Sequence, residues 1–405
     1  MKFSKLSQLV LVSAIGLLVA TLLTACQIVT IDYVFVAGTA GSGTGSTGQI
    51  ETYAVDSESG ALRSGGATVA SGGVNPVSMA LTSDYENLYA ANAGSDSITH
   101  FTIALNGALT AKDTVTLTAA PVAIAVNAAN TYLYVVSGSG TPTLTAYPLS
   151  SGTIGTAGAP QPLSIPGYTG DTLVATGINV LGNSDAVFIT AFDQTAYNPG
   201  GPVTSTANPG WVFSFATGSG GALSPAANSP FKAGVKPTAV ISDPTFRFVY
   251  VTDFASNQLI GYSVQAGYTL TFLLNGPFRT GNEPSSLAID PRGKYIYVAN
   301  ALDSSITAYS IDLSTGTPST AVNTSGSTTN STDTQPVSII VDPALGRYVY
   351  TANYLGDSVS GFRLNPNNGT LTTTQATPYP TTSLVKPTAL VSIPHGNHST
   401  QSITP

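Results

Sequence analysis

A few charged residues stand at related places along a chain that is otherwise poor in charge. Lys236, Glu283 and Lys386 each directly precede a proline that opens a short apolar segment, and Arg279 lies four residues before Glu283. A carboxylate can act as a general base toward water, and a nearby cation can hold an anionic group or stabilise an oxyanion. Because these charges do not recur at every related position, they are candidates for chemistry rather than for folding.

Uncharged and acidic polar residues occupy similar positions. Asn75 and Gln335 also precede such a proline, and Asp171 lies in a comparable loop. Asn and Asp recur directly after a second kind of apolar segment, as at Asn300. We predict that eight residues bind a small-molecule or protein ligand: Lys236, Lys386, Asn75, Gln335, Asp171, Asp253, Asn300 and Asn353. For the repeated Asn and Asp an alternative stays open, namely that their side chains cap loops as Asx turns.

The elements that would position these residues repeat along the chain. Segments of alternating aromatic and β-branched residues, typical of strands, begin near residues 33, 88, 133, 187, 249, 296 and 349. Pro284 precedes Tyr297 by 13 residues, and the same offset separates Pro76 from Tyr89. Between the two strands of a unit lies a turn such as 290–293, whose Asp-Pro start favours a β-turn. Units of about 45 to 62 residues with several strands each are typical of propeller blades.

The two ends of the repeat indicate how the ring closes. The strand near Tyr33 has no proline-led strand before it, and the proline-led segment 386–391 has no second strand after it. We therefore predict an all-β fold, a seven-bladed β-propeller of four-stranded antiparallel blades over residues 26–393. The C-terminal strand completes the N-terminal blade, which removes exposed strand edges. An open solenoid is the alternative, and residues 394–405 are expected to form a disordered tail.

The repeated strands, with motifs such as "YVAN" at 297–300 and "YTAN" at 350–353, resemble the seven-bladed lactonase family and the looser group of YVTN-repeat surface proteins. The resemblance covers nearly all of residues 30–393. It implies that the face carrying the starts of the proline-led strands forms the mouth of a central channel and holds the site. It also implies lactone hydrolysis, with Glu283 and Arg279 as catalytic residues and no cofactor.

Two functions of different classes remain open. The first is a non-catalytic propeller that binds a ligand or protein partner through its mouth loops. The second is a lactone hydrolase, in which Glu283 activates water while Arg279 or Lys236 holds a carboxylate or stabilises the oxyanion. A long loop at 192–210, ending at Trp211, is a candidate lid or partner contact, whereas 314–335 has the composition of a solvated excursion.

The N-terminus has the composition of an export signal. Lys2 and Lys5 precede an apolar run from Leu9 to Leu23, and Cys26 follows small residues. This pattern resembles the lipobox of bacterial lipoproteins, which implies that residues 1–25 are removed and that Cys26 is lipidated. Gln27, rather than Asp, favours the outer membrane by the same resemblance. A single transmembrane anchor is the alternative, although the run is short for a span.

Composition excludes other classes of partner. The formal net charge is −7, and Lys and Arg form no clusters, so we expect no binding to nucleic acid. Cys26 is the only cysteine, so a disulfide within the chain is excluded. No spacing of residues suggests a metal site, and we expect a monomer.

"GTGSTG" at 43–48 leads into a strand instead of a helix, so it is a loop and not a dinucleotide fingerprint. His100 lies within a strand, where packing is a more natural role than catalysis.

Overall fold

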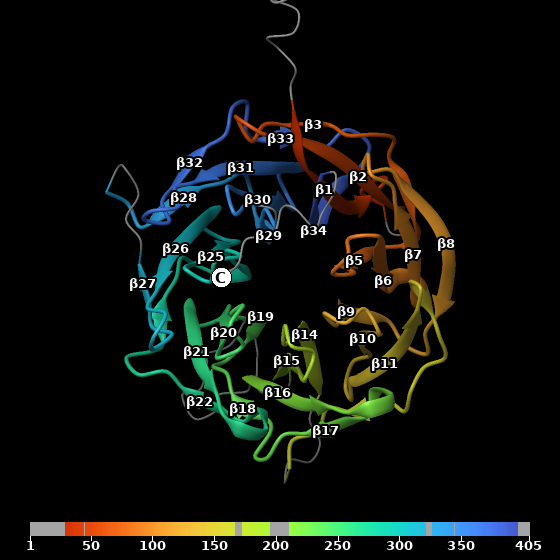
Figure 1. The fold of residues 1–405 in the computed structure, drawn as a ribbon, viewed down its shortest axis with the longest axis vertical. Coiled ribbons are helices and arrows are strands. Elements are labelled where there is room, and N and C mark those ends of the chain that lie inside the picture. The colour runs from red at the N-terminus through yellow and green to blue at the C-terminus, as the bar shows by residue number, and fades with distance from the viewer. Residues whose placement is uncertain are drawn as a thin grey trace, which may run out of the picture.

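The computed structural model describes residues 29–43, 45–166, 172–194, 210–320, 326–343 and 345–395. In these residues seven antiparallel sheets are arranged around a central axis, and the chain passes round the ring once from the N-terminus to the C-terminus (Figure 1). The predicted seven-bladed β-propeller is confirmed. No helix in the described part of the chain has the length and apolar character needed to cross a membrane.

Each blade places its strands in order from the channel outward. The innermost strands, in blade order one to seven, are β34 (Val385–Pro394), β5 (Pro76–Leu81), β9 (Pro121–Val126), β14 (Leu173–Val180), β19 (Pro237–Ser242), β24 (Pro284–Ile289) and β29 (Pro336–Val341). The second strands are β1 (Thr30–Thr39), β6 (Asn87–Asn92), β10 (Tyr132–Ser137), β15 (Ala186–Asp193), β20 (Phe248–Asp253), β25 (Tyr295–Asn300) and β30 (Tyr348–Asn353). The third strands are β2 (Thr47–Asp56), β7 (Ser97–Ile103), β11 (Thr143–Ser150), β16 (Gly210–Thr217), β21 (Gln258–Val264), β26 (Ser305–Ile311) and β31 (Ser358–Leu364).

The outer strand differs from the expected single strand. It is continuous only in the second blade, as β8 (Leu109–Thr116), and is split into two short strands in the other six. The pairs are β3 (Leu62–Ser64) with β4 (Val69–Val74), β12 (Thr153–Ile154) with β13 (Gln161–Pro162), β17 (Leu223–Pro225) with β18 (Phe231–Lys232), β22 (Leu270–Phe272) with β23 (Phe278–Arg279), β27 (Pro318–Thr320) with β28 (Thr329–Ser331), and β32 (Leu371–Thr373) with β33 (Tyr379–Pro380). Short 3-10 turns are η1 (Ala93–Ser95), η2 (Ser219–Gly221) and η3 (Ala266–Tyr268). Proline, which lacks an N–H for the ladder, lies in or beside many of these breaks.

Ring closure follows the prediction from the sequence. β34 pairs antiparallel with β1, with Phe35 opposite Val391 and Tyr33 opposite Ile393. In Figure 1 the red β1 and the blue β34 therefore lie side by side although they come from opposite ends of the chain. The first blade thus contains strands from both ends, which leaves neither terminal strand as an open edge.

The turn between the innermost and second strands of a blade contains a recurring Asp, whose carboxylate binds backbone N–H groups of the turn. The Asp290 carboxylate accepts hydrogen bonds from the backbone N–H groups of Lys294 (2.6 Å) and Tyr295 (2.8 Å). Asp243 does the same for Phe248 (2.7 Å), and Asp342 for Tyr348 (2.8 Å). Each carboxylate satisfies donors that the tight turn would otherwise leave unpaired.

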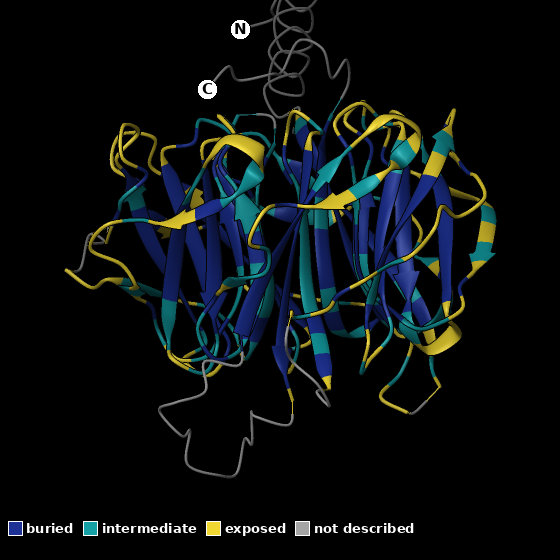
Figure 2. Ribbon diagram, turned by 90° about the horizontal axis from the view of Figure 1, so that it is seen from below, coloured by how far each residue is buried: buried dark blue, intermediate teal, exposed yellow. Residues whose placement is uncertain are grey.

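The apolar core consists of seven clusters, each packed between neighbouring blades. Because the second strand of each blade contacts a neighbour on both faces, it is almost entirely buried, as the dark blue strands of Figure 2 show. Tyr297, for example, packs toward the seventh blade, while Ile296 and Val298 pack toward the fifth. The alternation of aromatic and β-branched residues along these strands therefore supplies side chains to the apolar clusters on both faces of the blade.

The repeated tyrosine of the second strand also connects the blades by a hydrogen bond. Its hydroxyl donates to the carbonyl of a glycine in the next blade: Tyr89 to Gly152 (2.6 Å), Tyr250 to Gly316 (2.6 Å), Tyr297 to Gly369 (2.9 Å) and Tyr350 to Gly60 (2.8 Å). The four glycines have φ between +69° and +82°, a backbone conformation that side chains disfavour. One tyrosine and one glycine per unit therefore account for much of the repetition in the sequence.

Candidate functional site

The face that carries the starts of the innermost strands and the loops between second and third strands is called the mouth face here. Four residues predicted to lie there, all directly before a proline, have left-handed backbones: Asn75 (φ 54°), Glu283 (φ 56°), Gln335 (φ 59°) and Lys386 (φ 50°). Non-glycine residues rarely adopt this conformation, and where it persists it often marks a ligand site. The ring of predicted residues is thus held in an unusual but uniform geometry.

Loops of the preceding blades fix this geometry. Asp357 accepts the Lys386 N–H at 2.7 Å, Asn257 accepts the Glu283 N–H at 2.8 Å, and Ser304 accepts the Gln335 N–H at 3.3 Å. Each acceptor lies in the loop between the second and third strands of the blade before. The side chains at the mouth are therefore anchored at their backbones before any ligand arrives, which favours precise positioning.

Lys236 is anchored by a buried carboxylate instead. The Asp253 carboxylate accepts the N–H groups of Val235 (3.0 Å) and Lys236 (2.9 Å) and the side-chain amide of Gln258 (3.0 Å). Asp253 is fully buried, so its charge is stabilised by these three donors. Its role in the structure is to hold the segment that leads into β19.

The Lys236 ammonium lies against two aromatic rings. Its Nζ is 4.3 Å from the centre of the Phe254 ring and 5.6 Å from that of Phe192, within the range of cation–π contact. Burial lowers the pKa of Lys236, and the nearby Glu283 carboxylate acts against this shift. Sequence reasoning missed both phenylalanines. Phe254 could have been noticed, because blades two, three, four, six and seven have Ala, Gly, Gln, Ala and Tyr at the corresponding position.

Glu283 lies close enough to Lys236 to act on the pKa of that lysine, whereas Arg279 lies at the outer edge of its blade. Arg279 belongs to β23 at the outer edge of its blade, where it pairs with Gln258 and its carbonyl accepts the Tyr309 hydroxyl. Glu283 directly precedes the innermost strand β24, and the described residues include no ion pair between it and Arg279. Between Arg279 and Glu283 the chain passes from the outer edge of the fifth blade to the innermost strand of the sixth. The catalytic roles of Glu283 and Arg279 stay predictions.

The repeated Asn and Asp residues at the ends of the second strands face inward. Asn300 and Asn353 are fully buried, and each donates its side-chain amide to two hydroxyls of its own blade, such as Ser305 (3.1 Å) and Ser358 (3.0 Å). Asn92 is similarly buried and bonded to Ser71. The Asn300 and Asn353 amides bond to side-chain hydroxyls of their own blade, which differs from the Asx turns of the alternative interpretation. Ligand contact by Asp253, Asn300 and Asn353 stays a prediction.

A pocket of ≈ 510 Å³ opens on the mouth face between the first, second and seventh blades. The glycine-rich residues 41–43 and 45–46 form one wall, and Asn75, Tyr354, Lys386 and Thr388 form the others. It therefore brings together two of the predicted ligand-binding residues, Asn75 and Lys386, which are 311 positions apart in the chain. Its size is within the range of small-molecule sites.

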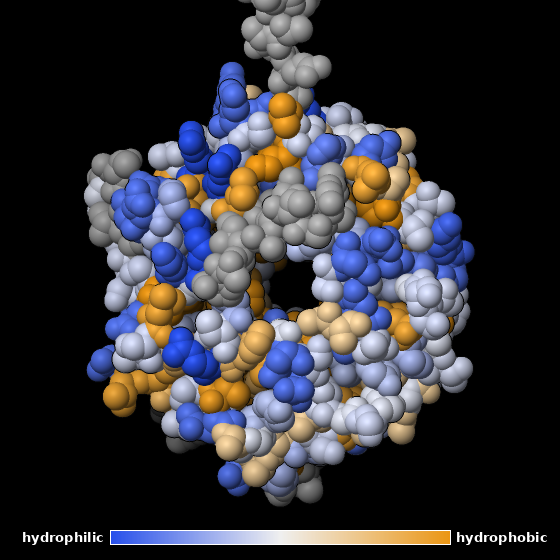
Figure 3. All heavy atoms as spheres, viewed as in Figure 1, coloured by the Kyte–Doolittle hydropathy of each residue, from blue (hydrophilic) through white to orange (hydrophobic). Residues whose placement is uncertain are grey.

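The channel behind the mouth is a second cavity, of ≈ 520 Å³, lined by the innermost strands. Figure 3 shows it as an opening at the centre of the ring. Hydroxyls of these strands donate to proline carbonyls of the next blade at 2.7 Å: Thr176 to Pro237, Thr238 to Pro284, Ser285 to Pro336 and Thr388 to Pro76. These bonds connect neighbouring blades around the channel, so the hydroxyls have a structural role in holding the ring together.

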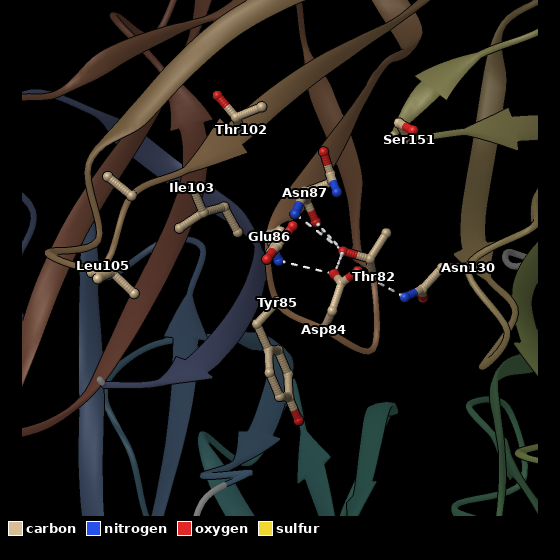
Figure 4. A pocket seen from close by; sticks show the side chains of 12 residues that line it. Thr82, Asp84, Tyr85, Glu86, Asn87, Thr102, Ile103, Leu105, Asn130 and Ser151 are labelled. Carbon is tan, nitrogen blue, oxygen red and sulfur yellow. Dashed lines mark hydrogen bonds between the residues drawn. The ribbon is translucent and has the colours of Figure 1, made fainter. Parts of the chain in front are cut away.

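On the opposite face a hollow of ≈ 650 Å³ surrounds the turn of the second blade (Figure 4). Asp84 is central there, but its carboxylate accepts the Thr82 hydroxyl (2.5 Å), the Glu86 N–H (3.0 Å) and the Asn130 amide (3.1 Å). The bond with Asn130 joins the second blade to the third, so Asp84 stabilises the contact between these two blades. No group of three or more His, Cys, Asp or Glu side chains within the described ranges is arranged to hold a metal ion.

His100 lies in the same blade, away from the mouth. Its Nδ1 is 2.8 Å from Asp113 Oδ1, its Nε2 is 2.8 Å from Asn87 Oδ1, and its ring stacks on Tyr89. The side chain is buried, and its two nitrogens are both engaged within the blade. Cys26, Asp171 and most of the loop 192–210 lie outside the described residues.

The fold and the mouth define the class of this chain: it is a seven-bladed β-propeller with a polar, preorganised mouth. Residues 232–383 match the family model "Lactonase, 7-bladed beta-propeller", and this match confirms the resemblance to the lactonase-type propellers. No curated protein matches the chain in sequence.

Solved structures of the same fold include proteins from three bacteria. The periplasmic gluconolactonase of Pseudomonas aeruginosa is 18% identical, with a TM-score of 0.70 over 91% of this chain and 100% of that one. A candidate 6-phosphogluconolactonase of Bacteroides fragilis is 18% identical, with a TM-score of 0.69 over 91% and 99%. A similarly described protein of Bacteroides uniformis is 17% identical, with a TM-score of 0.71 over 90% and 100%. At these identities the likeness concerns the fold.

Proposed function

We propose that this chain hydrolyses a small lactone at its mouth face, as a carboxylic-ester hydrolase of the lactonase type. The observation that supports this most is the placement of the Glu283 carboxylate near the Lys236 ammonium, at the starts of adjacent blades. A base beside a cation is the minimum that lactone hydrolysis needs. The match to the lactonase family model and the names of the structural neighbours support the same reaction.

The reaction would proceed by attack of water on the lactone carbonyl. The Glu283 carboxylate takes a proton from the water as its oxygen bonds to the carbonyl carbon, and the Lys236 ammonium stabilises the oxyanion that forms. Collapse of the tetrahedral intermediate breaks the ring C–O bond, and the leaving alkoxide takes the proton from Glu283. The product is the open hydroxy acid, so that atoms and charges balance with water as the only co-reactant.

The test is a hydrolysis screen of unsubstituted aldonolactones and other small lactones with the purified chain, with and without a chelator. Glu283→Gln should lower the rate by about 100-fold or more, because it removes the base but keeps the shape. Lys236→Met should lower it by about 100-fold through loss of oxyanion stabilisation. Glu58→Gln, an exposed change on the opposite face, is the matched control. A Glu283→Gln rate equal to that of the unmodified chain would contradict the mechanism.

A second candidate function is binding without catalysis. It is favoured by the mouth's anchored polar ring, whose buried Asn and Asp side chains are occupied in holding loops. Under this proposal the chain is a ligand- or partner-binding propeller, and the folded protein turns over none of the lactones in the screen. The same purified protein would then be used in pull-downs, with the loop 192–210 replaced by a short linker as the comparison.

We further propose that the protein is exported and anchored through a lipid on Cys26, in the outer membrane. The support is the signal-like segment before Cys26 and the residue Gln27. Metabolic labelling with a radioactive fatty acid should mark the unmodified chain but not Cys26→Ser. Label retained in Cys26→Ser, or recovery of the unmodified chain in the soluble fraction, would contradict the anchor.

A further inference from the structure

We propose that the pocket between the glycine-rich residues 41–43 and 45–46 and Lys386 binds the anionic group of a small molecule, a carboxylate or a phosphate ester. Lys386 opens the first blade and Asn75 the second, whereas Lys236 and Glu283 open the fifth and sixth. The pocket is therefore separate from the pair used for lactone hydrolysis, and this proposal does not depend on that activity.

The charge of the pocket points to an anion. Among the described residues that line it, Lys386 is the only charged one and none carries a carboxylate. In the part of the chain that the structure describes, the Lys386 ammonium forms no ion pair. Asp357 touches Lys386 through the backbone, where its carboxylate accepts the N–H at 2.7 Å, and it does not line the pocket. A bound anion would therefore meet a lysine that is not already in an ion pair.

The other polar groups of the pocket divide into two sets. The Thr39 hydroxyl donates to the Gly41 carbonyl (2.8 Å), Ser46 to Gly43 (2.8 Å) and Thr388 to Pro76 (2.7 Å), so these three shape the walls. The side chains of Ser42, Asn75 and Tyr354 have no hydrogen-bond partner among the described residues. Three donors next to one cation form a set that can surround an oxyanion.

A Cβ would fit at the glycines of the 41–43 and 45–46 wall, whereas at most other glycines of the propeller it would meet neighbouring atoms. A Cβ at Gly45 would meet nothing within 4 Å, and one at Gly41 or Gly43 would meet only the Ser46 hydroxyl at 3.5 or 3.6 Å. By contrast, a Cβ at Gly48 would lie 2.1 Å from Ser71. Packing within the protein therefore does not require glycine at Gly41 or Gly43, whereas the backbone of Gly45 (φ +83°) itself favours glycine. Glycine there allows a ligand to approach the backbone closely.

The two sides of the pocket are held in place before binding. Lys386 and Asn75 both have the left-handed backbone described above, and the Asn75 carbonyl accepts the Ala93 N–H at 2.9 Å. The Thr388–Pro76 hydrogen bond connects the blade of Lys386 to that of Asn75. A pocket whose walls are fixed in this way loses little conformational entropy when an anion binds.

The experiment is isothermal titration of the full chain with inorganic phosphate and, separately, with gluconate, with neutral glucose as the uncharged comparison. We expect at least one anion to bind, with an affinity that falls as salt rises, and glucose not to bind at this site. The two anions distinguish a phosphate ester from a carboxylate as the natural group. Absence of binding by both anions would overturn the proposal.

Four variants locate the binding. Lys386→Met should weaken anion affinity by about tenfold or more, which corresponds to one charge-assisted contact. Ser42→Glu leaves Lys386 intact and should weaken it similarly, by placing a carboxylate in the wall. Lys294→Met removes an exposed lysine from the opposite face, and Glu283→Gln removes the proposed base; both should bind like the unmodified chain. Equal loss in Lys294→Met, or none in folded Lys386→Met, would overturn the site. Tighter anion binding in Glu283→Gln would also overturn it and would place the anion beside Lys236, because that variant removes a repelling carboxylate there.

Discussion

Asp32 in β1 and Asp342 in the turn between β29 and β30 are two buried carboxyl groups that interact across the seam between the first and seventh blades. Asp342 is held by backbone donors, among them the N–H groups of Leu345 (2.9 Å) and Tyr348 (2.8 Å). Neither oxygen of Asp32 has a hydrogen-bond partner in the described part of the chain. Burial first, and then the charge of Asp342, raise the pKa of Asp32 to about 9.

This pair predicts a pH dependence of stability. Asp32 is protonated in the folded state and ionised in the unfolded chain, so folding takes up a proton between the unfolded pKa of 3.8 and about 9. The free energy of unfolding should therefore fall as pH rises through this window. Asp32→Asn removes the titration and should raise the melting temperature by several degrees at pH 8 to 9, with a smaller gain near pH 4. Thermal melts across this range, with exposed Asp96→Asn as the control, check it; parallel curves for Asp32→Asn and the unmodified chain would contradict it.

The tyrosine–glycine bonds between blades should contribute measurably to stability. Tyr297→Phe removes the hydroxyl that donates to Gly369 at 2.9 Å and leaves a buried carbonyl without its donor. We expect a loss of about 1 kcal/mol in the free energy of unfolding. Denaturant unfolding measures it, and Tyr132→Phe is the control, because the Tyr132 hydroxyl has no hydrogen-bond partner among the described residues. A loss in Tyr132→Phe as large as in Tyr297→Phe would show that the bond is not the cause.

The glycine side of the same contact can be tested by size. At Gly369 (φ +74°) a Cβ would lie 2.3 Å from the Tyr295 ring, whereas at Gly267 (φ +70°) it would meet nothing within 4 Å. Both Ala variants suffer the backbone strain, which costs about 1 kcal/mol, but only Gly369→Ala also displaces a ring. We expect Gly369→Ala to cost about 3 kcal/mol in total. Equal unfolding free energies for the two variants would rule out the steric contribution.

Asp253 is predicted to act on activity by positioning Lys236. In Asp253→Asn only one side-chain oxygen remains to accept the N–H groups of Val235 and Lys236, so the segment must shift. If the hydrolysis proposed above is observed, kcat should fall by about tenfold with little change in KM. Rescue by Asp253→Glu would not be expected, because the longer side chain does not fit the buried site. A variant that is folded and has an unchanged kcat would remove Asp253 from the positioning role.

The sequence predicted the fold well because the propeller repeats its local rules. Proline at the start of the innermost strand, the Asp turn and the tyrosine of the second strand recur at fixed offsets, and the unpaired segment 386–391 indicated the closure. The split outer strands could not be foreseen in the same way, since they are short, exposed and without strong periodicity.

The site was predicted less completely, because the sequence does not show how far each residue lies from the central channel. Arg279 and Glu283 are near in sequence, yet one lies at the outer edge of a blade and the other at the channel. Lys236 and Glu283 are 47 residues apart, which is one step around the ring, and therefore interact. The phenylalanines beside Lys236 depend on neighbours in two blades, which no local pattern reveals. Asn75 and Lys386 were recognised by their place before a proline, but not as two walls of one pocket.

Both ends of the described chain leave the ring on the side away from the mouth, where the Ile31 carbonyl accepts the His395 N–H at 2.8 Å. β1 has 10 residues and spans about 33 Å from that side to the mouth loops. If the chain is anchored through Cys26 as proposed, the mouth lies on the face of the ring opposite to the end from which the chain leads toward the anchor. Solutes would reach that opening by diffusion from the aqueous compartment, without first partitioning into the membrane surface.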